Sequence, residues 1–118
     1  MKTFKFNNNW NDKMICNNFT TLRPYYPNNS PNTSEIVVCT WKEIVFHCEV
    51  VSVVKFPKIE DVPDFIFYLD LGYCKTESLK IIENMFKQYI DIYNHTWALF
   101  TLKQRPEITK KINEAEKN

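Results

Sequence analysis

FTTLRPYYP, residues 19–27, predicts a β-strand that ends in a polar and aromatic edge. Its first four residues suit a pleated, half-buried surface, and Pro24 has no N–H to donate to a neighbouring strand. Because side chains alternate along a strand, Thr21 and Arg23 share one face while Thr20 points to the other. We therefore expect one face of this strand to present a hydroxyl group beside a fixed positive charge.

Short strands and helices, separated by polar turns, are predicted on both sides of this strand. Period-two alternation and β-prone residues indicate the strands, whereas an apolar stripe from Leu79 to Ile90 indicates the main helix, with Thr76 as its N-cap. Residues 25–34 form a long polar loop of a kind that often carries binding groups. The expected strands are 2–6, 19–22, 35–41, 44–54 and 97–103, and the expected helices are 10–16, 64–71 and 76–90.

Composition limits the chain to one domain and excludes several classes of function. A chain of 118 residues builds one hydrophobic core. Its net charge of +1 supplies no overall field that would draw it to nucleic acid or to a membrane. The single glycine, Gly72, excludes both the phosphate-binding loop G-x-x-x-x-G-K-[ST] and the dinucleotide-binding G-x-G-x-x-G.

The pattern of elements favours an α+β fold built on a small β-barrel, because strands outnumber helices and most are joined by short turns. We expect a domain at residues 1–105 with five or six mostly antiparallel strands, one long helix and one or two short helices. Residues 106–118 are rich in lysine and glutamate. They are expected to form a polar, partly helical or disordered tail, which is either solvated or a helix that binds a partner.

The four cysteines show neither a C-x-x-C pair nor zinc-ribbon spacing, which indicates reduced thiols in a cytoplasmic protein. No apolar run approaches the roughly 18 residues of a membrane span. His47 and Glu49 share the wet face of one strand, with Cys39 on its expected neighbour. No further histidine motif supports a metal there, so we expect no metal and no cofactor. The Asn-, Lys- and Ile-rich composition favours a bacterial or phage source.

Four segments occur in an order that resembles a known family. They are TTLR at 20–23, EIVV at 35–38, EVVSV at 49–53 and LDLGY at 69–73. TTLR is similar to the T-[IV]-R signature of ASCH domains, and LDLGY is similar to the D-x-G-[FY] that precedes the main helix of that family. The resemblance covers residues 1 to about 104. It implies a barrel like that of the PUA RNA-binding domain, and binding of RNA, a nucleotide or a modified base.

The sequence departs from the ASCH pattern in two places. Ser34-Glu35 stands where the family usually has Gly-Asp before the third strand, and the second departure concerns the enzymatic members. Members that hydrolyse acylated cytidine have a lysine and a threonine in the cleft, with a glutamate from elsewhere, and here Asn18 stands at the position of that lysine. A neutral amide cannot act as a base, and a hydroxyl nucleophile such as Thr21 needs one nearby. Lys13 or Lys42 could fold in, although no motif favours either. We therefore expect a binding protein rather than an enzyme, with Thr21 as the catalytic residue if the chain is enzymatic.

The expected ligand cleft lies beside the TTLR strand. Arginine can hold a phosphate through two hydrogen bonds or stack on a base, and aromatic rings can stack on bases. The alternatives are that Arg23 pairs with a surface carboxylate and that Tyr73 fills the core. The predicted binding residues are Thr20, Thr21, Arg23, Tyr25, Trp41, Lys42 and Tyr73.

Three functions are compatible with these features. The first is a module that binds RNA, a nucleotide or a modified base in the cleft. The second, implied by the family resemblance, is an amidohydrolase of acylated cytidine. The third is a viral or bacterial interaction protein that acts on a host protein through loop 25–34 or tail 106–118.

Overall fold

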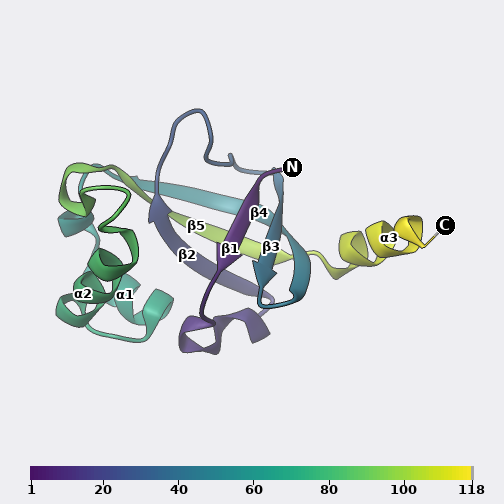
Figure 1. Ribbon diagram of the computed structural model, residues 1–118, viewed down its shortest axis with the longest axis horizontal. Coiled ribbons are helices and arrows are strands. Elements are labelled where there is room, and N and C mark those ends of the chain that lie inside the picture. The colour runs from purple at the N-terminus through teal and green to yellow at the C-terminus, as the bar shows by residue number, and fades with distance from the viewer. Residues whose placement is uncertain (118) are drawn as a thin grey trace.

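The computed structural model describes residues 1–117, so Asn118, the last residue of the expected tail, lies outside the described residues. Five strands form one sheet that curls into a half-barrel (Figure 1). The strands are β1 (Thr3–Phe6), β2 (Asn18–Pro24), β3 (Ile36–Trp41), β4 (Ile44–Phe56) and β5 (Trp97–Gln104). The α-helices are α1 (Asp64–Leu71), α2 (Lys75–Phe86) and α3 (Pro106–Glu116), and the 3-10 helices are η1 (Trp10–Ile15), η2 (Ile59–Asp61) and η3 (Ile92–Asn94).

The strand order β1-β3-β4-β5-β2 makes β1 and β2 the two edges of the sheet. β1 runs parallel to β3, and the other three pairs are antiparallel. The α+β fold with a small, mostly antiparallel barrel-like sheet is thereby confirmed. α1 and α2 cover one end of the sheet, and α3 projects from the other end (Figure 1).

Two hydrophobic clusters hold the fold together, and alternation along β2 connects them. Phe19 belongs to the inner cluster, which lies inside the curl of the sheet and to which all five strands contribute. Leu22, on the opposite face of β2, belongs to the outer cluster, which is formed with α1, α2 and the fully buried Trp97. β2 therefore buries both of its faces, because hydrophobic residues occupy both odd and even positions along the strand.

The alternation of β4 changes phase at a β-bulge. The register shifts between Val50 and Ser52, where one extra residue is accommodated. The sequence pattern places Val54 on the same face as Val50, but Val54 is exposed and Val53 packs against the inner cluster. A prediction that assumes regular alternation along the whole strand cannot show where this extra residue lies.

α3 is attached to β4 through His47, which the sequence pattern places on a wet face. The His47 side chain is instead buried. The Thr109 hydroxyl accepts a hydrogen bond from the His47 backbone N–H at 3.0 Å and lies 2.9 Å from Nδ1. Arg105, just before α3, pairs with Glu49 and Glu107. These contacts fix the base of α3, whereas its outer turns extend away from the sheet (Figure 1).

The main helix is shorter than its apolar stripe predicts. α2 ends at Phe86, where a tight turn directs the N–H groups of Tyr89 and Ile90 back to the Phe86 carbonyl at 2.8 and 3.0 Å. Ile90 still packs on the outer cluster, but the turn leaves Tyr89 78% exposed. The end of α2 therefore presents an aromatic ring at the surface.

Candidate functional site

A cavity of about 270 Å³ opens where the two sheet edges meet the helices. Five elements contribute to it: β1, η1, β2, α1 and α2. Its lining combines polar and charged side chains with apolar and aromatic ones. The lining residues are Lys5, Phe6, Asn7, Asn8, Trp10, Lys13, Thr21, Leu22, Arg23, Asp70, Leu71, Ile82, Met85, Phe86 and Tyr89.

Asp70 is the buried anchor of this cavity. It lies near the end of α1, which Gly72 closes in the left-handed conformation with φ of 82°. Its Oδ1 accepts hydrogen bonds from Lys13 Nζ at 3.0 Å and from the Thr20 hydroxyl at 3.1 Å. Its Oδ2 accepts the backbone N–H of Leu22 at 3.2 Å. Because β2 is an edge strand, the Leu22 N–H has no neighbouring strand to bond to, and the Asp70 carboxylate accepts its hydrogen bond instead.

Lys13 reaches Asp70 from η1 through an unusual backbone turn. Asn11 and Asp12 both adopt left-handed conformations, with φ of 57° and 51°, which these two residue types tolerate better than most. The Lys13 side chain is only 7% exposed. Its pKa is lowered mainly by burial; the charge and hydrogen bond of Asp70 oppose this shift, and the charge of Arg23 adds to it.

Arg23 connects the two edges of the half-barrel. Its Nε donates to the Thr21 hydroxyl at 3.1 Å, and its Nη2 donates to the Lys5 carbonyl in β1 at 2.9 Å. The guanidinium carbon lies 4.8 Å from the ring centroid of Phe4 and 4.7 Å from that of Phe6. Burial lowers the pKa of Arg23 to about 10, against the attraction of Asp70. The group therefore keeps its positive charge at neutral pH.

Three of the sequence-predicted residues come together in this region. Thr21 and Arg23 line the cavity. Thr20, on the other face of β2, supports it indirectly through its hydrogen bond to Asp70. The expected hydroxyl and cation on one strand face are thus in direct contact.

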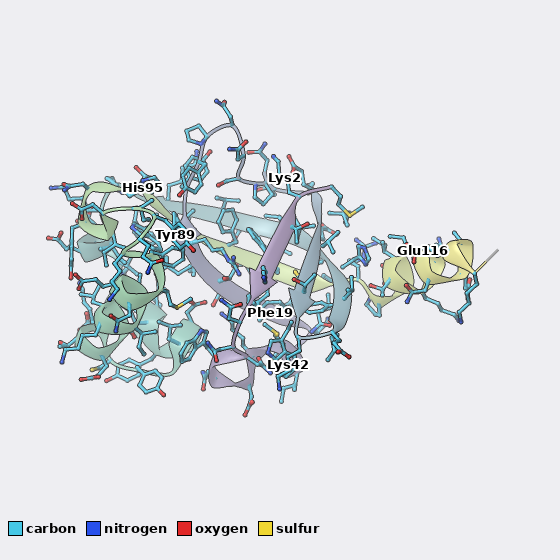
Figure 2. The ribbon with its side chains drawn as sticks, in the orientation of Figure 1. Lys2, Phe19, Lys42, Tyr89, His95 and Glu116 are labelled. Carbon is cyan, nitrogen blue, oxygen red and sulfur yellow. The ribbon has the colours of Figure 1, made fainter. Side chains whose placement is uncertain are left out.

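The other four predicted residues lie outside the cavity lining. Lys42 covers the ring of Trp41, with Nζ 4.8 Å from its centroid, at the turn between β3 and β4. Tyr25 is covered in the same way by Lys55 at 4.5 Å. Tyr73 is 46% exposed and lies edge-on to Trp10, which itself lines the cavity. In Figure 2, Tyr89 lies beside the helical layer and Lys42 lies at the β3–β4 turn.

The structure adds lining residues that sequence reasoning did not assign to the site. Asp70 had a detectable signal, because it is a carboxylate within the largely apolar helix DFIFYLDL and buried acids require partners. Lys13 was one of two lysines that could fold in toward Thr21, but no motif favoured it, because its position in the cavity depends on the left-handed turn of η1. Trp10 and Tyr89 reach the cavity from η1 and from the turn after α2.

The charge of the cavity differs from that of the whole chain. Three of its lining side chains are cationic, Lys5, Lys13 and Arg23, whereas Asp70 is the sole acid among the lining residues. The net charge of the chain is only +1. Positive charge is thus concentrated where an apolar wall also exists.

Comparison with protein-family models, with curated proteins and with solved structures finds no match to this chain. Within residues 1–117, histidine, cysteine and acidic side chains form no cluster of three or more that could bind a metal ion. No helix in that same range has the length and apolar character needed to cross a membrane. All four cysteines are free, and Cys39 and Cys48 are both buried.

Proposed function

We propose that the cavity binds a nucleotide or a single unpaired base of RNA. One observation supports this most strongly: two hydrogen-bond donors, the buried Lys13 and the partly buried Arg23, share a cavity with aromatic side chains. Ligand sites combine an apolar wall with a few placed polar groups, and single-stranded bases are held by stacking and by hydrogen bonds to their edges. A donor-rich floor suits the carbonyl and phosphate oxygens of such a ligand.

The size of the cavity favours one base over a folded segment. Its volume of about 270 Å³ lies just below the roughly 300–1,000 Å³ typical of ligand pockets. Tyr89 stands at the cavity with most of its ring exposed, in a position to stack on a base. Because the net charge of the chain is close to zero, we expect the contacts inside the cavity to supply most of the affinity.

Replacing Tyr89 with alanine is expected to weaken binding of nucleotides and short single-stranded RNAs about 5- to 150-fold. Loss of one base–aromatic stack costs roughly 1–3 kcal/mol. Tyr68→Ala is the matched control, because Tyr68 is also exposed but does not line the cavity. Isothermal titration calorimetry measures both variants. Equal affinities of Tyr89→Ala and wild type would show that Tyr89 does not contact the ligand. Millimolar or weaker binding of every ligand by the wild type would contradict the proposed function.

A second candidate is hydrolysis of an acylated cytidine, favoured by the presence of Lys13, Thr21 and a carboxylate in one cavity. Asn18, at the position of the family's lysine, is exposed and does not line the cavity. The lowered pKa of Lys13 makes its neutral, basic form more accessible than that of a solvated lysine. In this candidate Lys13 takes the proton of the Thr21 hydroxyl as its oxygen attacks the amide carbonyl. The C–N bond then breaks, the cytidine amine takes the proton from Lys13, and water hydrolyses the acetyl ester on Thr21 to release acetate.

Incubation with acetylated cytidine distinguishes the two candidates. The hydrolase candidate predicts cytidine and acetate from the wild type and none from Thr21→Val, which keeps the shape of the side chain. Thr109→Val is the matched control, because Thr109 lies at the base of α3. Absence of product from a folded wild-type protein rejects hydrolysis and leaves the binding function in place.

A further inference from the structure

The cations of the cavity keep hydrogen-bonding capacity that the protein itself does not use. Lys13 Nζ has three protons and donates to one acceptor, Asp70 Oδ1. Arg23 uses Nε and Nη2, while Nη1 makes no hydrogen bond within residues 1–117. The ammonium group of Lys5 pairs with no acid in that same part of the chain. These three groups are donors only, so their open positions suit an acceptor that carries negative charge.

Repulsion between the positive charges of Lys13 and Arg23 also favours binding of an anion. The charged groups that face Lys13 are Asp70 from α1 and Arg23 from β2, and the Phe6 ring of β1 lies 5.8 Å from Nζ. The charge of Arg23 and the burial of Lys13 both lower the pKa of Lys13, and Asp70 compensates only in part. A bound anion would reduce the repulsion between Lys13 and Arg23. The negative charge of Asp70 would oppose anion binding, and it leaves the three cations and Asp70 with a net charge of about +2.

We propose that the cavity binds the terminal phosphate of a nucleoside monophosphate between Lys13 and Arg23, with Lys5 at the entrance and the base on the Tyr89 side. This inference rests on the proposed nucleotide-binding function and names its ligand class. A phosphate monoester has a charge of about −1.5 to −2 at pH 7 and three acceptor oxygens, which matches the excess charge of the cavity. A phosphodiester within an RNA strand has only one negative charge. A chain terminus also fits a cavity of about 270 Å³ better than a continuing strand does.

Calorimetry with cytidine and adenosine 5′-monophosphates, the corresponding nucleosides and inorganic phosphate tests this assignment. We expect each monophosphate to bind the wild type at least about tenfold more tightly than its nucleoside, which corresponds to about 1.4 kcal/mol. Lys13→Met and Lys5→Met should remove most of this difference. Lys80→Met is the control, because Lys80 is exposed on α2 and does not line the cavity. Affinity for the monophosphates should fall as alkaline pH removes the proton of Lys13.

The outcomes separate the inference from the function on which it rests. Equal affinity for nucleosides and monophosphates overturns the phosphate site and leaves base binding intact. Binding of inorganic phosphate that is lost in Lys5→Met, without any nucleoside binding, supports the phosphate site and overturns base binding. Absence of all binding overturns both. If Lys13→Met fails to fold, the wild-type comparison and the exposed Lys5 still decide the question.

Discussion

Replacing Asp70 with asparagine is expected to lower the free energy of unfolding by about 3–5 kcal/mol, because it leaves the buried ammonium of Lys13 without a counter-charge. Small domains have only about 5–15 kcal/mol of stability, so this loss is a large fraction of the total. Urea denaturation followed by circular dichroism measures it. Asp64→Asn is the matched control on the same helix: its side chain is 76% exposed and lies 3.9 Å from Lys75, so we expect less than about 1 kcal/mol.

A double-variant cycle shows whether the effect depends on Lys13. If the unpaired charge causes the loss, Asp70→Asn combined with Lys13→Met should be more stable than Asp70→Asn alone. Part of the loss should remain, because Leu22 N–H and the Thr20 hydroxyl also depend on this carboxylate. A loss from Asp70→Asn no larger than that from Asp64→Asn would show that the pair does not stabilise the fold.

Replacing Arg23 with methionine is expected to lower the free energy of unfolding by about 2–5 kcal/mol. The variant loses a charged hydrogen bond from β2 to β1, typically about 1.5–3 kcal/mol, and the cation–π contacts with Phe4 and Phe6, about 0.5–2 kcal/mol. Since Arg23 links the two sheet edges, amide hydrogen exchange should accelerate first in β1. Arg23→Lys should recover only part of the stability, because an ammonium lacks the planar fork.

Arg105→Met is the matched control for Arg23→Met. Arg105 pairs with Glu49 and Glu107 at the base of α3, and about a third of its side chain is exposed. Solvent-accessible ion pairs contribute roughly 0–1 kcal/mol, so this variant should lose little stability. Equal losses from the two arginine substitutions, or unchanged exchange in β1, would contradict the role of Arg23 as the link between the edges.

The elements of the fold were largely predictable because local patterns determine them. The residues at 19–22 predicted the strand whose Phe19 and Leu22 enter different clusters, and the predicted helix at 64–71 has the bounds of α1. The pairing of β1 with β3, parallel and far apart in sequence, could not be read locally. The bulge at Val50/Ser52 was also hidden, because hydrophobic residues occupy both faces of that part of β4.

The site was predictable only where a single strand builds it. Thr21 and Arg23 share a face of β2 by alternation, and the structure places both in the cavity. The remaining lining residues depend on tertiary geometry: Lys13 on the left-handed turn of η1, and Tyr89 on the early end of α2. Trp41 is predicted in the cleft because its ring could stack on a base, yet the topology places it at the end of β3, beside the β3–β4 turn.

The three tryptophans provide the most direct measurement of where a ligand binds. Trp10 lines the cavity, whereas Trp41 lies at the β3–β4 turn and Trp97 is fully buried in the outer cluster. Each indole N–H gives its own signal in a ¹⁵N–¹H correlation spectrum. On titration with cytidine 5′-monophosphate, we predict that the Trp10 signal shifts while those of Trp41 and Trp97 stay in place. A spectrum in which Trp41 shifts and Trp10 does not, or in which none of the three moves at saturating nucleotide, would contradict nucleotide binding in this cavity.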